Sequence, residues 1–112
     1  MERIIEWAGL EGAKAELFRA VMRQLEEHSL TFEEVLERPE DYADARAGVP
    51  GFIYYLDTEP FATKNCHLIT QVLFELESEI GPLEKDTQNV LNWMAWFALE
   101  WAIGIVMDYK GA

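Results

Sequence analysis

The chain has 112 residues, of which 50% are apolar, enough for one domain with its own hydrophobic core. Its 21 acidic residues outnumber 9 basic ones, and the formal net charge of −12 excludes the basic surface that direct binding of nucleic acid or of an anionic membrane requires. We therefore expect a protein partner with a basic surface, although excess acid also serves simply to keep small proteins soluble.

The N-terminal part is predicted to form three helices. Residues 2–8 fit a short helical turn, and from 13 to 28 the apolar residues recur at the spacing of one helical face. That face consists of Leu17, Phe18, Val21, Met22 and Leu25, and the opposite face carries Lys14, Arg19 and Arg23. Thr31 and Glu34 then have the spacing of a capping box. The short helix that follows must end before Pro39, because the residue before a proline avoids the helical conformation.

The middle of the chain lacks a helical pattern. Residues 40–50 fit a loop with Tyr42 and Val49 as its anchors. Residues 51–56 are rich in β-branched and aromatic side chains, but the chain contains no second run with which such a strand could pair. We therefore expect one short extended segment near 51–56, tucked between helices, and no sheet.

Two longer helices complete the predicted order. The first spans about 59–80, with Asp57 or Thr58 as its N-terminal cap and a Gly-Pro pair as its stop. The second begins after a cap at Asp86 or Thr87. It runs almost to the end of the sequence.

This last helix, ending near Tyr109, is apolar almost all round. Between 90 and 107 only Asn92 and Glu100 are clearly polar, and three of the four tryptophans of the chain lie there. The length approaches a membrane span, but a charged residue inside such a span is costly, so we expect a buried core helix instead. The prediction is one all-α domain over 1–112, a compact bundle of four to five helices around this Trp-rich helix.

Acidic residues concentrate in one stretch. Between 26 and 44 eight acids stand against Arg38 alone, and a second acidic group lies at 75–86. If the fold joined the two groups, they would form one negative surface, and carboxylates along a helix can imitate DNA, which carries one charge per ~1.7 Å. The expected partner-binding residues are Glu33, Glu34, Glu37, Glu40, Asp41 and Asp44. A solvated helix face without any partner is the alternative.

No residue pattern indicates catalysis. Cys66 and His67 are adjacent, so on a helix their side chains point about 100° apart and cannot form a nucleophile and its base. No carboxylate pair has a histidine at metal-ligand spacing. Glu100 fits a core carboxylate, bonded to a tyrosine or to Arg19 or Arg23, better than a catalytic acid. We expect a protein that is not an enzyme and that has no cofactor and no metal.

Two further features concern compartment and assembly. With Cys66 as its single cysteine the chain cannot form an internal disulfide bond, and residues 1–12 contain acids and no long apolar run, unlike a secretory signal. We therefore expect a cytoplasmic protein. Three tryptophans in one helix exceed what a small core needs, which leaves a homodimer across that helix as an alternative to simple core packing.

Residues 51–58 (GFIYYLDT) and 89–102 (NVLNWMAWFALEWA) resemble a group of small uncharacterised proteins from phages and mobile elements. The likeness spans 51–102, rests on aromatic positions and brings no functional residues with it. In size, acidity and lack of catalytic motifs the chain is also similar in type to phage-encoded anti-CRISPR proteins. Together these likenesses imply a non-enzymatic phage inhibitor of host defence, which binds a basic surface of a CRISPR effector or nuclease in the host cytoplasm. A homodimeric accessory or antitoxin-like protein is the alternative.

Overall fold

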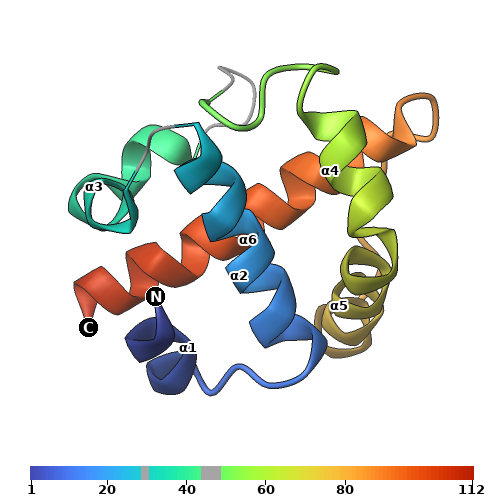
Figure 1. The fold of residues 1–112 in the computed structure, drawn as a ribbon. Coiled ribbons are helices and arrows are strands. Elements are labelled where there is room, and N and C mark those ends of the chain that lie inside the picture. The colour runs from blue at the N-terminus through green and yellow to red at the C-terminus, as the bar shows by residue number, and fades with distance from the viewer. Residues whose placement is uncertain (29–30, 44–48) are drawn as a thin grey trace.

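The structure, a computed structural model, describes residues 1–28, 31–43 and 49–112 (Figure 1). These residues form six α-helices and one short 3-10 helix, η1, and include no strand. In chain order the elements are α1 (Glu2–Ala8), α2 (Ala13–Glu27), α3 (Phe32–Glu37), η1 (Pro39–Tyr42), α4 (Thr58–Lys64), α5 (Cys66–Ile80) and α6 (Val90–Gly111). The all-α prediction is confirmed, with one α-helix more than the four to five expected.

Helix α6 is the centre of the fold and contacts η1 and each of the other helices. In Figure 1 it runs diagonally behind α2, with α4 beside its first half and α1 near its end. Its buried residues are Asn92, Met94, Ala95, Ala98, Leu99, Ala102, Ile103 and Val106. Apart from Asn92 they are apolar and recur every four residues, at 94/95, 98/99, 102/103 and 106, which is the spacing of one helical face. Three alanines among them let neighbouring helices approach closely. The Cα radius of gyration is 13.1 Å, as expected for a compact chain of this length.

The other side of α6 is less completely covered. Val90 and Met107 are exposed on it, and all three of its tryptophans are half-buried. The next longest helices, α2 and α5, have 15 residues each against 22 in α6, so neither extends along its whole length. The helix is the core of the fold, as predicted, but its tryptophans lie at the edge of that core and not inside it.

The predictions for α2 and α3 are confirmed. The five apolar residues chosen from the periodicity of α2 are all buried. At the start of α3 the Thr31 hydroxyl accepts the Glu34 amide and the Glu34 carboxylate accepts the Thr31 amide, each at 3.2 Å, which is the complete capping box. The helix ends at Glu37, two residues before Pro39, in agreement with the restriction that proline places on its predecessor.

The helix predicted over 59–80 is two helices that meet at Asn65. This residue is buried, and its side-chain amide donates a hydrogen bond of 3.0 Å to the Phe61 carbonyl of the preceding turn. Asparagine side chains compete with the backbone for such carbonyls, which weakens the helix where they occur. The chain leaves the helical conformation at Asn65 and begins α5 at Cys66.

Residues 51–56 form a tight turn, which corrects the expectation of an extended segment. Tyr55 has a positive φ of 59°, a conformation that closes the backbone on itself. The side chains of Asp57 and Thr58 accept the amides of Ile53 and Tyr55, each at 3.0 Å. They therefore stabilise the turn that precedes α4. Asp57 holds the N-cap position of α4, as predicted, but its side chain forms no cap hydrogen bond with that helix. Phe52 is the one residue of the turn that reaches the core as a large buried side chain.

Candidate partner-binding surfaces

The acidic face predicted from the sequence maps to α3 and η1, at the left of Figure 1. Its described carboxylates are all exposed, and the sixth predicted residue, Asp44, lies outside the residues that the structure describes. The described ones are Glu33, Glu34, Glu37, Glu40 and Asp41. Both α3 and η1 pack against α6, which fixes this acidic face at one end of the molecule.

Three of these five carboxylates already have partners. Arg3 Nη2 lies 3.3 Å from both carboxylate oxygens of Glu33, and Arg38 Nε lies 3.1 Å from Asp41 Oδ2. The carboxylate of Glu34 is engaged in the capping box. The negative charge that this face offers to a partner is therefore smaller than the sequence alone implies.

Glu37 and Glu40 remain exposed, and among the described residues neither carboxylate forms an ion pair. Beside Glu37 an open hollow of about 840 Å³ lies between α1, α3 and the end of α6. Trp7 and Tyr109 line this hollow and contact each other edge to face, with ring centroids 5.3 Å apart. Lys110, also in its wall, donates a hydrogen bond to the Glu37 carbonyl.

The second acidic group does not join the first. It lies on the end of α5 and the loop after it, on the other side of α2 from α3 in Figure 1. Two of its members form ion pairs, Glu77 with Lys85 at 2.8 Å and Glu79 with Lys14 at 3.7 Å. The continuous negative surface considered from the sequence is therefore absent from the described residues.

An aromatic groove of about 760 Å³ lies along the first half of α6. Its lining combines aromatic rings with carboxylates, and the residues are Tyr54, Leu83, Glu84, Asp86, Asn92, Trp93, Trp96, Phe97 and Glu100. Trp93 and Phe97 stack in parallel with centroids 5.6 Å apart, and the Lys85 ammonium lies 6.0 Å from the centroid of Trp93. No stretch of the sequence predicts this groove, because its walls come from three separate segments.

Hydrogen bonds hold the walls of the aromatic groove in place. The Tyr54 hydroxyl donates to that of Tyr55 at 3.1 Å, and the Tyr55 hydroxyl donates to Asn89 Oδ1 at 2.7 Å. The bond with Tyr54 is the main cause that raises the pKa of Tyr55 to about 12. The buried Thr58 hydroxyl donates to Asn92 Oδ1 at 2.8 Å, which ties the turn to α6.

The loop before α6 is also well connected. Asp86 Oδ1 accepts the amides of Gln88 at 2.9 Å and Asn89 at 3.1 Å, and the Gln88 bond is the largest cause that lowers the pKa of Asp86. Asp86 thus caps the turn, while Asn89 holds the N-cap position of α6 that the sequence assigned to Asp86 or Thr87.

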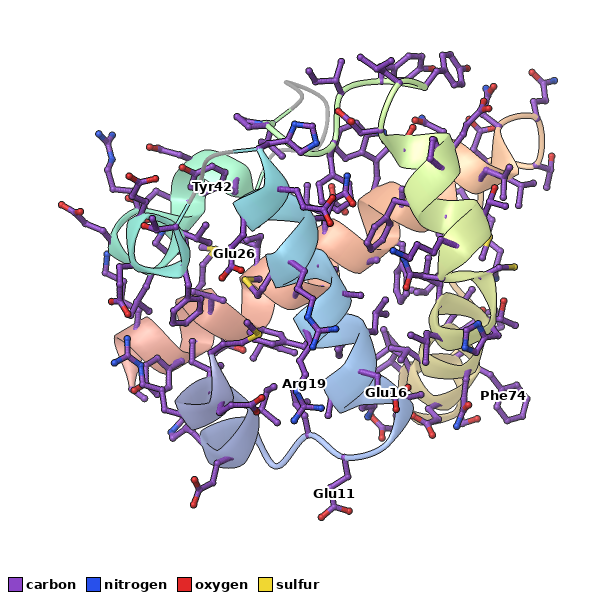
Figure 2. The ribbon with its side chains drawn as sticks, in the orientation of Figure 1. Glu11, Glu16, Arg19, Glu26, Tyr42 and Phe74 are labelled. Carbon is purple, nitrogen blue, oxygen red and sulfur yellow. The ribbon has the colours of Figure 1, made fainter. Side chains whose placement is uncertain are left out.

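Exposed apolar side chains gather next to the aromatic groove. Within the part of the chain that the structure describes, ten large apolar residues are exposed, and six of them lie in the turn and at the start of α6, namely Ile53, Tyr54, Tyr55, Leu56, Val90 and Leu91. We call these six the apolar patch. By contrast, Phe74 stands on α5 and points away from the molecule (Figure 2). Clusters of exposed apolar residues mark interaction sites more often than scattered ones do.

The residues weighed for catalysis do not assemble into a site. Cys66 and His67 are both exposed at the start of α5. Glu100 is exposed in the wall of the aromatic groove, so the expectation of a core carboxylate is wrong. One partner proposed for it, Arg19, instead donates two hydrogen bonds to Glu2, at 2.8 and 2.9 Å. Figure 2 shows Arg19 on the front of α2.

The described residues bear on two further properties, metal binding and membrane insertion. No group of three or more His, Cys, Asp or Glu side chains that could hold a metal ion occurs there. Helix α6 is long and apolar enough to cross a membrane, by length and composition only, and 44% of its most apolar window is buried inside the molecule. The core helix of a globular domain can be equally long and apolar. Helix α6 contacts every other described helix, as a core helix does.

Residues 43–104 match a family model described as a domain of unknown function (DUF7222). The matched segment includes the stretch 51–102 on which the resemblance to phage proteins rested, but its description carries no link to phages or to anti-CRISPR proteins. It contains every residue that lines the aromatic groove, whereas residues 33–41 of the acidic face precede it. Comparison with curated proteins and with solved structures finds no match.

Proposed function

We propose that the chain, which belongs to the DUF7222 family, is a non-enzymatic binding protein whose partner presents a basic surface. The observation that carries the proposal is the exposed acidic face on α3 and η1 of a chain whose net charge is −12. Charge of this magnitude steers a basic partner toward the protein and accelerates encounter.

The finer proposal is an inhibitor of host defence of the anti-CRISPR type. In it the acidic face imitates nucleic-acid phosphates and occupies a basic groove of a CRISPR effector or a nuclease in the host cytoplasm. Small size, acidity and the resemblance to phage proteins support this type of function. Because three of the five described carboxylates have partners within the molecule, Glu37 and Glu40 carry most of the mimicry.

A pull-down from bacterial lysate that expresses CRISPR effectors tests this proposal, with washes at low and at high salt. The variant Glu33→Lys/Glu37→Lys/Glu40→Lys should lose an effector that the wild type retains at low salt. The matched control reverses three exposed acids elsewhere, Glu11, Glu16 and Glu59, of which Figure 2 shows the first two at the lower end of the molecule. If both variants lost the effector equally, its retention would depend on net charge alone and not on the acidic face. Retention of the effector by the first variant would refute the mimicry.

The apolar patch favours a second candidate function, a homodimeric accessory or antitoxin-like protein. Burial of the patch against a second copy would remove apolar area from water, and such association survives high salt, unlike a charged contact. Leu56 is 71% exposed and Phe74 is 72% exposed, so Leu56→Asp and Phe74→Asp form a matched pair. Light scattering at high salt should then show a dimer that Leu56→Asp abolishes and Phe74→Asp leaves intact. A wild type that stays monomeric at all concentrations would exclude this function.

A further inference from the structure

We propose that the aromatic groove binds an arginine side chain presented by a basic peptide segment of the partner. This inference specifies the chemistry of the basic partner and so rests on the proposed function, but it places recognition at a different surface. The groove lies beside α6 and the turn at 53–56, whereas the acidic face lies on α3 and η1.

The lining of the groove favours a cation. Trp93, Trp96 and Phe97 offer aromatic rings, and the face of a tryptophan ring is the most favourable side-chain surface for a positive charge. Glu84 and Asp86 add negative charge at the same walls and disfavour an anionic ligand. The molecule already contains one such contact of its own, because the Lys85 ammonium lies over the ring of Trp93.

Arginine fits this lining better than lysine does. Its guanidinium group is planar and weakly hydrated, so it stacks on aromatic rings and at the same time donates paired hydrogen bonds to a carboxylate. An ammonium group is compact and strongly hydrated, and it can do only one of these well. A volume of about 760 Å³ also lies within the range of pockets that enclose most of a small ligand, so the neighbouring atoms of a peptide can enter with the side chain.

The groove is formed before any ligand arrives. The Glu77 carboxylate accepts the Lys85 ammonium and the Leu83 amide, each at 2.8 Å, which fixes the loop that makes one wall. Asp86 fixes the next turn through two backbone amides. A preformed site loses little conformational entropy on binding, which leaves more of the contact energy for affinity. The exposed Tyr54 and Leu56 beside it offer apolar contact to residues that flank the arginine.

The four tryptophans provide the test, since each indole N–H gives its own signal in a nitrogen–proton correlation spectrum. Trp93 and Trp96 line the groove, and Trp7 lines the hollow beside the acidic face. The probe is a short capped peptide of alternating arginine and glycine, with matched peptides in which lysine or neutral citrulline replaces arginine. We expect the arginine peptide to shift the Trp93 and Trp96 signals and to leave the Trp7 signal where it is. The lysine peptide should do so more weakly and the citrulline peptide not at all.

Two substitutions at the rim should weaken the arginine peptide without disturbing the core. Glu84→Gln removes one charge and Tyr54→Leu removes one ring, and each should raise Kd about fivefold, the equivalent of a single exposed cation–π or charge contact. Both side chains are exposed. Glu59→Gln, an exposed acid on α4 outside the groove lining, is the control and should leave Kd unchanged.

The outcomes separate this inference from the proposed function. Shifts confined to Trp7 would overturn the groove assignment and keep the acidic face as the binding surface. Equal binding of the citrulline peptide would overturn the requirement for a cation, and equal binding of the lysine peptide would overturn the choice of arginine. An arginine peptide that shifts none of the four signals would overturn the groove assignment, while the pull-down decides independently whether the acidic face binds a basic partner.

Discussion

Thr58 makes the buried polar contact that joins the turn at 53–56 to α6, and its removal should cost measurable stability. Its side chain is fully buried, and its hydroxyl accepts the Tyr55 amide at 3.0 Å and donates to Asn92 Oδ1 at 2.8 Å. Thr58→Val keeps the shape of the side chain and removes both bonds. A buried polar group left without its partner costs about 1–3 kcal/mol. The Tyr55 amide can bond to water after the substitution, so most of the cost comes from the buried Asn92 oxygen that loses its donor. We expect a loss of about 2 kcal/mol in the free energy of unfolding.

Urea unfolding followed by tryptophan fluorescence measures this loss, and a thermal scan should show a Tm lower by about 8 °C for a domain of this size. Thr63→Val is the matched control, because Thr63 lies on the same helix and is exposed, and its substitution should change stability by less than about 0.5 kcal/mol. In the double variant Thr58→Val/Asn92→Leu both partners are gone, and part of the loss should return. Equal effects of Thr58→Val and Thr63→Val would refute the reasoning.

Three further predictions concern the turn and the loop. Gly51→Ala should lower the free energy of unfolding by about 2 kcal/mol in urea titration, because φ is 91° there and a Cβ would lie 2.9 Å from the Gln24 carbonyl oxygen; unchanged stability would contradict this close approach. In Tyr54→Phe the pKa of Tyr55, raised to about 12 by its bond with Tyr54, should fall toward 10 when phenolate absorbance is titrated. In the wild type this raised pKa favours folding below pH 10, and the contribution to stability disappears between pH 10 and 12. An unaltered phenolate titration in the variant would exclude the bond with Tyr54 as the cause of the raised pKa. Hydrogen bonds lower the pKa of Asp86 from 3.8, so its contribution to stability is present above that value and is lost as pH falls further. Asp86→Asn should therefore flatten the profile of Tm against pH below about 4, and an identical profile would count against this role.

The parts of the fold that the sequence predicted are those with local causes. The buried face of α2 follows from the 3.6-residue period, and the start of α3 follows from two side chains three residues apart. Such signals need no knowledge of the rest of the chain. The all-α class followed in the same way, since one run of β-branched and aromatic residues cannot form a sheet alone.

The parts that could not be predicted depend on residues far apart in the sequence. The Thr58 hydroxyl caps no amide of α4, because it accepts the Tyr55 amide in the preceding turn and donates to the Asn92 side chain on α6. The negative charge of the acidic face was overestimated, because Arg3, thirty positions away, neutralises Glu33. The aromatic groove draws on residues 54, 83–86 and 92–100, and no single stretch of them has a motif.

The acidic face and the aromatic groove should act as independent binding surfaces, and this independence can be measured. Trp96 in the groove and Tyr109 in the hollow beside the acidic face both lie on α6, and their separation of 13 positions corresponds to about 20 Å of helix. Charges that far apart are screened at physiological salt, where the Debye length is about 8 Å. Glu37→Lys/Glu40→Lys should therefore leave the Kd of the arginine peptide at the groove within about twofold of wild type, whereas Glu84→Gln raises it about fivefold.

A protein partner that uses both surfaces gives the stronger form of this test. For an effector retained in the pull-down, we compare Glu37→Lys/Glu40→Lys, Glu84→Gln and the variant that combines all three substitutions. The fold-increase in Kd of the combined variant should equal the product of the two separate fold-increases, because distant sites without shared contacts contribute additively in free energy. Isothermal titration at fixed ionic strength measures all three values. A combined loss that falls well short of the product would show that one partner segment contacts both surfaces or that they share a long-range field. In that case arginine recognition and phosphate mimicry would be two descriptions of a single electrostatic site.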